Sequence, residues 1–316
     1  MGKVYSMDVM VTDRCNADCP HCINKSYRTA AEISVPDFKN LAKCLSGIGY
    51  SQLRLMGGEP TIHPSFSDIV KISQTEFRHV VVMTNGRGDS FLQFKPRDSD
   101  RVVYNLNAMP LTIDVAMLKV DEAGDRVFSV VFSKDSDAMI LVEKAKRIAS
   151  VPNMLERAVF DIVIDLTEDL FETRTGIQEK VRLFYKACSA IGAKMSIVSP
   201  RELPMLYPMC FREYASDSIG TAPAKLCHRS TPGHVDAELY WRFCHAFPVR
   251  LGKFGTVSWE EVCRRAVQCC KERLMITQGR CGKCTSFGVK CDGGCFALTK
   301  LAGYSEIESR WGGFQG

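Results

Sequence analysis

Short apolar runs alternate with amphipathic segments along the first two hundred residues. Six of the runs are rich in Val, Ile and Met, as expected for strands buried on both faces of a parallel sheet. They span residues 5–11, 52–56, 80–83, 102–106, 159–164 and 194–198. Strands that alternate with helices predict an α/β fold, and six of them predict a partial (β/α)6 barrel. Right-handed crossovers would then place the carboxyl ends of the strands along one common rim.

The amphipathic segments carry signals for helices. Ser34 can cap a helix whose first turn contains Pro36 and Asp37. Residues 138–149 and 177–191 have apolar residues at helical spacing and predict two further helices.

The later part of the chain predicts a change of organisation. Residues 118–132 contain Glu-Ala-Gly-Asp between two apolar runs, which predicts a hairpin inserted after the fourth strand. The alternation stops in a segment with repeated prolines, and nine of the cysteines follow it. We therefore expect a barrel domain at residues 1–200, a linker at 201–226 and a small cysteine-rich domain at 227–316.

Composition narrows the class of protein. The chain has 316 residues, a net charge of +5 and 15 cysteines. No run of Lys and Arg suggests a nucleic-acid partner, and no apolar stretch reaches the roughly 20 residues of a membrane span. The N-terminus lacks a secretory apolar region, so we expect a cytoplasmic protein. Cysteine clusters in a reducing compartment are better read as metal ligands than as disulfides.

The most specific motif follows the first predicted strand. Cys15, Cys19 and Cys22 have the spacing C-x3-C-x2-C. Three thiolates so close in sequence can hold one cubane cluster and leave one iron without a protein ligand, open for chemistry. A zinc site or a set of buried structural thiols is the alternative for this motif alone.

A second motif follows the second predicted strand. Gly57-Gly58-Glu59-Pro60 places two glycines where the backbone can approach a ligand closely. Its carboxylate can form a charge-assisted bond with an ammonium group. By itself, this sequence is also an ordinary turn.

Together with the cysteine loop, this second motif resembles the radical S-adenosylmethionine (SAM) superfamily. The resemblance implies a [4Fe-4S] cluster on the three cysteines, whose open iron binds SAM, and an element around Glu59 that binds the methionine amino group. It implies an oxidoreductase or maturase that takes one electron from a flavodoxin- or ferredoxin-type donor. The cleaved SAM then yields a radical that abstracts a hydrogen atom from the substrate.

Further residues extend the resemblance at the same rim. Thr84 and Asn85 end the third strand in the family pattern, and Asn105 and Asn107 follow the fourth, near the ribose. The family often has Ser and Asp in the latter region, so the asparagines are a departure. His21 precedes the third cysteine, where an aromatic or apolar residue is usual, and we expect it to stack near the adenine.

The C-terminal cysteines form a second field with the spacing C-x2-C-x6-C-x3-C, preceded by two single cysteines. A four-thiolate zinc site is the alternative here. The layout resembles the SPASM and Twitch subgroup, which implies one or two auxiliary [4Fe-4S] clusters. One gap is a residue longer than in that pattern, and the usual final cysteine is missing. The candidate ligands are Cys227, Cys244, Cys281, Cys284, Cys291 and Cys295.

The other cysteines have different interpretations. Cys210 lies in the predicted linker and is a speculative hydrogen-atom donor to a substrate radical. Cys44 and Cys188 lie on apolar stripes and are expected in the core. The thiols on the C-terminal helix are expected to pack, at Cys263, Cys269 and Cys270.

Three functions remain open from the sequence. The first is modification of a residue in a ribosomally made peptide, which rests on the SPASM and Twitch resemblance. The first strand is expected to begin near residue 4, which leaves no room ahead of it for a peptide-recognition domain, although such a domain could be a separate protein. The second is a radical dehydrogenase or rearrangement enzyme for a small molecule such as a sugar or nucleotide. The third is a zinc-stabilised interaction protein without enzymatic activity.

Overall fold

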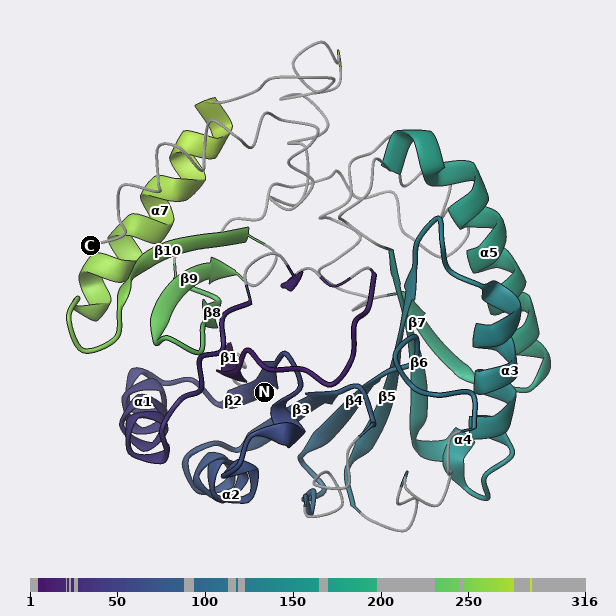
Figure 1. Cartoon of the computed structure of the whole chain (residues 1–316), viewed down its shortest axis with the longest axis horizontal. Coiled ribbons are helices and arrows are strands. Elements are labelled where there is room, and N and C mark those ends of the chain that lie inside the picture. The colour runs from purple at the N-terminus through teal and green to yellow at the C-terminus, as the bar shows by residue number, and fades with distance from the viewer. Residues whose placement is uncertain are drawn as a thin grey trace.

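A curved sheet forms the centre of the fold. The computed structural model describes residues 5–20, 22, 24–25, 28–87, 94–112, 118, 123–164, 170–197, 231–244, 247–275 and 285. Ten strands lie in the order β10-β9-β8-β1-β2-β3-β4-β5-β6-β7. Helices cover the outer side of the curve, with α1 and α2 beside β1–β3 and α3 and α5 beside β5–β7 (Figure 1).

The first seven strands are parallel, and each pairs with the next. This arrangement confirms the predicted α/β partial barrel, with one strand more than expected. The strands are β1 (Ser6–Thr12), β2 (Gln52–Gly57), β3 (His79–Thr84), β4 (Arg101–Asn105), β5 (Asp125–Phe132), β6 (Ala158–Ile164) and β7 (Lys194–Ile197). The helices between them are α1 (Val35–Ile48), the 3-10 turn η2 (Pro60–Ile62), α2 (Phe66–Glu76), α3 (Ala138–Ala149), α4 (Met154–Arg157) and α5 (Leu170–Ala190).

The additional strand is β5, and it corrects the predicted hairpin. Asp125–Phe132 pairs in parallel with β4 on one side and β6 on the other. Gly124, with a φ of 87°, makes the turn into this strand. A Cβ on Gly124 would lie 2.7 Å from the carbonyl oxygen of Asp100. Gly124 therefore marks the entry to a buried parallel strand and not a turn within a hairpin.

The capping residues seen in the sequence lie at the observed ends of helices. Ser34 caps α1 by accepting a hydrogen bond from the main-chain N–H of Asp37 at 3.2 Å. Gly49 ends the helix with a φ of 104°, a conformation that favours glycine. Asp137 caps α3 through the N–H groups of Met139 and Ile140. These caps fix where the chain leaves the outer layer and returns to the sheet.

Aromatic side chains fill the space between the sheet and its outer helices. Tyr104, Phe128 and Phe160 stand in register on β4, β5 and β6 and stack at centroid distances of 5.2 and 5.3 Å. Phe184 of α5 packs edge-on against Phe160. Burial of these rings stabilises the parallel sheet. It also fixes the register of the strands whose carboxyl ends form the rim.

The C-terminal segment continues the same sheet. β8 (His234–Val235) pairs in parallel with β1, and β9 (Tyr240–Cys244) and β10 (Phe247–Lys253) follow as antiparallel strands. α7 (Trp259–Met275) lies beside β10 (Figure 1). Ser258 caps α7 by accepting from the N–H of Glu261 at 3.2 Å. The predicted domain boundaries stay a prediction, and residues 201–226 lie outside the described residues.

No helix among the described residues is long and apolar enough to cross a membrane.

Candidate functional site

The cysteine loop leaves β1 and returns beside it. Thr12 and Glu32 form an isolated antiparallel bridge, and the N–H of Asp13 donates to the carbonyl of Ala31 at 2.9 Å. The carboxylate of Asp13 accepts from both the main-chain N–H and the hydroxyl of Thr29. These contacts close the loop at its base, so the intervening residues are held at the carboxyl end of β1.

The three N-terminal cysteines lie half-buried in this loop. The N–H of Cys22 donates to the carbonyl of Cys19 at 3.2 Å. Burial raises the pKa of the Cys19 thiol, and the proximity of Cys22 and Cys15 raises it further. Arg87 and Arg28 act in the opposite direction, because they attract the thiolate. Cys15 and Cys22 therefore lie close enough to Cys19 to act on its charge, as neighbouring ligands of one cluster would.

The described residues contain no group of three His, Cys, Asp or Glu side chains that could hold a metal ion. A cubane cluster differs from a single ion, because each thiolate ligates a different iron. In a cubane site the thiolates therefore surround a cluster-sized volume and do not converge on one point. The donor set of three neighbouring thiols in one loop is the set that such a cluster uses.

The two glycines of the second motif lie directly against the end of β1. The N–H of Gly58 donates to the carbonyl of Thr12, and the N–H of Glu59 donates to the carbonyl of Arg14, both at 2.8 Å. A Cβ on Gly57 would lie 2.4 Å from the Thr12 carbonyl oxygen, and one on Gly58 would lie 2.1 Å from that of Arg14. The glycines let β2 approach the start of the cysteine loop, which no other residue could allow without a shift of backbone.

Glu59 is buried between the ends of β2 and β3. Its Oε1 accepts from the N–H of Thr61 at 3.2 Å, from the Thr61 hydroxyl at 2.7 Å and from the Thr84 hydroxyl at 2.8 Å. Its Oε2 accepts from the N–H of Asn85 at 2.6 Å. Burial raises the pKa of this carboxyl group, while these donors favour its charged form. Pro60 follows as the first residue of η2. The carboxylate is thus oriented before any ligand arrives, and Oε2 carries the fewer bonds.

Asn85 connects this carboxylate to the cysteine loop. Its main-chain N–H donates to Glu59, and its Nδ2 donates to the side-chain oxygen Oδ1 of Asn16 at 2.7 Å. The same Nδ2 lies 3.8 Å from the Cys15 sulfur. The structure therefore brings the predicted residues from β1, β2 and β3 into direct contact.

The two asparagines after β4 make their own local contacts. The side chain of Asn107 donates to the carbonyl of Val131 and accepts from its N–H, both at 2.7 Å. The side-chain oxygen of Asn105 accepts from the N–H groups of Asn107 and Ala108. Asn107 therefore extends the pairing between β4 and β5. Asn105 shapes the turn, and its Nδ2 has no hydrogen-bond partner among the described residues.

Lys144 holds the same turn from the outer layer. This buried side chain of α3 donates to the carbonyls of Leu106, Asn107 and Met109, at 2.9, 3.2 and 2.6 Å. Burial and the nearby Arg87 lower the pKa of Lys144. Arg87 itself donates to the carbonyl of Ala108, so two cations hold one turn of the rim.

Several predicted site residues lie outside the described residues. Cys244 is the last residue of β9, and its main chain pairs with Phe247 of β10. Those outside the described residues are His21, Cys210, Cys227, Cys281, Cys284, Cys291 and Cys295. The auxiliary-cluster ligands therefore stay a prediction.

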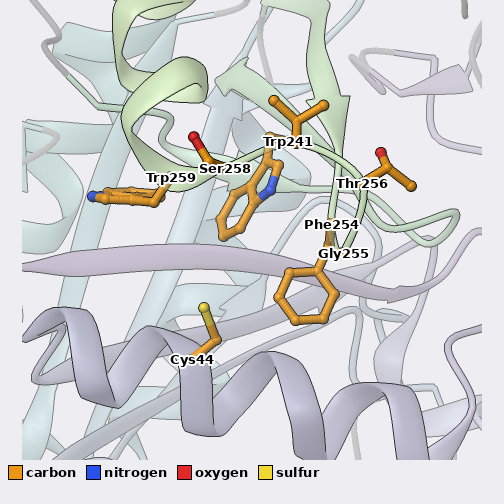
Figure 2. Close-up of a pocket in the computed structure, with 8 residues that line it drawn as sticks. Cys44, Trp241, Phe254, Gly255, Thr256, Ser258 and Trp259 are labelled. Atoms are coloured by element: carbon orange, nitrogen blue, oxygen red, sulfur yellow. The ribbon is translucent and has the colours of Figure 1, made fainter.

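The remaining described cysteines mostly lie in the core. Cys188, Cys269 and Cys270 are buried, as expected, and Cys263 is half-buried on α7. Cys44 differs from its prediction, because it is half-buried and lines a cavity of about 330 Å³. Figure 2 shows this cavity between α1 and the β9–β10 region, with aromatic side chains including Trp241 and Trp259. None of its eight lining residues is charged, and burial raises the pKa of the Cys44 thiol.

Sequence reasoning missed the residues that hold the site together. No sequence motif predicted the contacts made by four side chains, those of Asp13, Arg28, Glu32 and Lys144. A buried Lys in the amphipathic segment 138–149 was a usable signal, because an ammonium group on an apolar face requires acceptors. The others depend on how the loop returns to β1, which the sequence does not specify.

Comparison with known proteins agrees with this arrangement. Residues 9–128 match the family described as the Radical SAM superfamily. A probable GTP 3′,8-cyclase of Methanothermobacter marburgensis is 37% identical over 110 residues, which cover 34% of this chain and 36% of that protein. The match to this curated relative therefore spans about a third of its length.

Two solved structures share the fold over most of the chain. One is Streptococcus suis SuiB bound to the precursor peptide SuiA, with a TM-score of 0.63 and 13% identity over 93% of this chain and 72% of SuiB. The other is anSMEcpe with bound AdoMet and Cp18Cys peptide, with a TM-score of 0.58 and 13% identity over 99% of this chain and 97% of anSMEcpe. Together with the rim contacts described above, the family match leads to one conclusion. Residues 9–128 of this chain form a Radical SAM superfamily domain.

Proposed function

We propose that this chain reductively cleaves SAM at a [4Fe-4S] cluster and uses the resulting radical to modify a residue of a ribosomally made peptide. One observation carries the first half of the proposal. Cys15 of the cysteine loop, Glu59 after β2 and Asn85 after β3 lie in one bonded group at the rim.

The residues of this group have distinct tasks. Cys15, Cys19 and Cys22 would hold three irons of the cluster, in a loop closed at its base by Asp13 and Thr29. The main chain at Gly57 and Gly58 and the Oε2 atom of Glu59 would bind the amino group of SAM. Because Glu59 is already held by four hydrogen bonds, binding would cost little reorganisation.

The wider rim would receive the rest of the cofactor. When bound, the cluster and SAM would together supply a 5′-deoxyadenosyl radical that takes a hydrogen atom from the substrate. Thr84 holds Glu59, and the side-chain amide nitrogen of Asn105, which has no hydrogen-bond partner within the described part of the chain, is a candidate donor to the ribose. Asn107 supports that turn through Val131. His21 would stack near the adenine, and Cys210 stays a speculative hydrogen-atom donor.

A peptide substrate is favoured because this chain shares its fold, over nearly its whole length, with two proteins solved with a bound peptide. The two solved structures that this chain resembles over 93% and 99% of its length both contain a bound peptide. Auxiliary clusters, on the C-terminal cysteines and Cys244, would accept an electron from the substrate or ligate it. An external flavodoxin- or ferredoxin-type protein would supply the electron.

A nucleotide substrate is the second candidate. The curated relative with the 37% match is named as a GTP 3′,8-cyclase. That match covers 34% of this chain, so it argues for a shared cofactor site more than for a shared substrate.

Anaerobic reconstitution with iron and sulfide tests the first half of the proposal. We expect 5′-deoxyadenosine to form when SAM and a reductant are both added, and a zinc-loaded protein without that product would contradict it. For the substrate, the protein is incubated with short peptides encoded beside its gene or with GTP, each deuterated at carbon. Deuterium in the 5′-deoxyadenosine from peptide alone supports the peptide, and deuterium from GTP alone supports the nucleotide.

A further inference from the structure

Arg28 touches the cysteine loop through a sulfur atom. Its Nη2 lies 3.1 Å from the Sγ of Cys22. Its Nε is buried and has no hydrogen-bond partner among the described residues. One face of the guanidinium therefore donates to a cluster-forming thiol, and a second N–H remains available on the same planar group.

The main chain fixes the position of this arginine. The next residue, Thr29, bonds the carboxylate of Asp13 through its N–H and its hydroxyl. The N–H of Asp13 in turn donates to Ala31. Arg28 therefore enters the site from the segment that closes the loop, and its guanidinium is delivered to Cys22 by the fold of that loop.

The guanidinium interacts with all three thiols. Burial opposes its charge, but Cys22, Cys15 and Cys19 together outweigh burial and raise the pKa of Arg28. Arg87 attracts Cys19 as well, yet its side chain is exposed and its Nε is engaged with Ala108. Of these two cations, only Arg28 donates a hydrogen bond to one of these sulfurs within the described part of the chain.

We propose that Arg28 sets the reduction potential of the cluster by donating N–H···S hydrogen bonds to the Cys22 thiolate and by placing a fixed positive charge beside the cluster. Hydrogen bonds to cluster sulfurs and the nearby charge are among the determinants of iron–sulfur potentials. A cation stabilises the reduced cluster more than the oxidised one, because reduction adds one negative charge. Arg28 thus raises the reduction potential of the cluster, so that a weakly reducing physiological electron donor can reduce it more easily.

The redox step is a transfer of one electron. The donor, a flavodoxin- or ferredoxin-type protein in the cell or dithionite in the test, is oxidised by one electron, and the cluster is reduced by one. No bond to Arg28 forms or breaks, and its proton stays on the guanidinium. Arg28 is a positioning residue by this account, and the inference rests on the proposed function, since it needs the cluster to be present.

The test is a redox titration of the reconstituted protein in the absence of SAM. The amount of reduced cluster is measured at each potential from its electron paramagnetic resonance signal. Arg28→Gln removes the charge and keeps an N–H donor, whereas Arg28→Lys keeps the charge and loses the planar pair of donors. Arg264→Gln on α7, where the exposed arginine pairs with Glu261, changes the net charge equally and is the matched control.

We expect the ratio of reduced to oxidised cluster at a fixed potential to fall about tenfold in Arg28→Gln, a shift of about 59 mV for one electron. Arg28→Lys should shift less, and Arg264→Gln should match the unaltered protein. Iron content and the thermal melting of the apoprotein show that each variant is folded and loaded. If Arg28→Gln does not hold the cluster, a lowered potential in Arg28→Lys still supports the proposal.

Two failures remain distinguishable. A potential that is unchanged in both Arg28 variants, or in Arg28→Lys where the glutamine variant holds no cluster, overturns the role of Arg28 and leaves the proposed function intact. A reconstituted unaltered protein without any signal of a reduced cubane cluster overturns the proposed function itself.

Discussion

The rim is held differently around β2 and β3 than around β4 and β5. At β2 and β3, two glycines press the main chain against the end of β1, and one buried carboxylate ties the strand ends together. At β4 and β5, the turn is held by the amide of Asn107 and by the ammonium group of Lys144. The first region depends on close backbone contact, and the second depends on long side chains that reach across.

This difference separates two kinds of polar residue at one rim. Glu59 accepts three hydrogen bonds on Oε1 and one on Oε2, so Oε2 can accept a further bond from a ligand while the carboxylate keeps its position. Asn107 uses both its donor and its acceptor on Val131, so its contribution is structural. A polar residue at the carboxyl end of a strand is therefore a candidate ligand group only after its own contacts are known.

Among the variants that compare these two regions, the largest expected effect comes from Gly58→Ala. The new Cβ would lie 2.1 Å from the Arg14 carbonyl oxygen, so the cysteine loop must move away from β2. A displacement of this kind costs about 10²-fold in turnover, measured as 5′-deoxyadenosine formed per reconstituted cluster. Gly47→Ala in α1 is the control, since nothing lies within 4 Å of its Cβ. Equal activity in Gly58→Ala and the unaltered protein would show that the close approach is unimportant.

Lys144→Met tests the other region. Three carbonyls lose a charged donor, and we expect a loss of about 2–3 kcal/mol in the free energy of unfolding, measured by urea denaturation of the apoprotein. Lys146→Met, whose side chain is exposed near the end of the same helix, should change stability little. A Lys144 variant as stable as its control would mean that the turn does not need the ammonium group.

Thr84→Val should have a smaller effect with a different signature. It removes the 2.8 Å hydrogen bond to Glu59 and an acceptor for the N–H of Gly86, at a cost of about 1–3 kcal/mol. Part of that loss should appear as weaker SAM binding, which equilibrium dialysis of the reconstituted protein can measure. Thr84→Ser keeps the hydroxyl and should restore both properties. Failure of serine to do so would refute the role of this hydrogen bond.

The smallest effect on the cofactor is expected from Asn107→Ala. The variant loses both bonds to Val131, so stability should fall by about 1–3 kcal/mol. SAM affinity in the same dialysis should change less than it does in Thr84→Val. A larger loss of affinity in Asn107→Ala would show that this asparagine contacts the cofactor and that the contrast between the two regions is wrong.

The sequence predicted those parts of the fold that depend on local patterns. Each of the six predicted strands lies within a residue or two of an observed strand, because buried parallel strands are short apolar runs. Asp125–Phe132 was assigned to a hairpin, because Gly124 marks a turn but does not say which strand follows it. The cap of α1 at Ser34 was predicted correctly, because a cap is a contact between near neighbours.

The candidate site divides in the same way. The motifs identified Cys15, Glu59 and Asn85, and the structure brings them together. The contact from Arg28 to Cys22 could not be predicted, because it depends on the path of the loop back to Thr12. The space beside the Cβ positions of the two glycines is filled by the end of β1, and contact of their main chain with a ligand stays a prediction.

One comparison of variants tests the central claim most directly. The unaltered protein, a variant with Cys15, Cys19 and Cys22 all changed to Ala, and Cys263→Ser on α7 are reconstituted anaerobically and supplied with SAM and dithionite. We predict 5′-deoxyadenosine from the unaltered protein and from Cys263→Ser, and none above background from the triple variant. Continued formation of that product by the triple variant would contradict the assignment of the cluster to this loop.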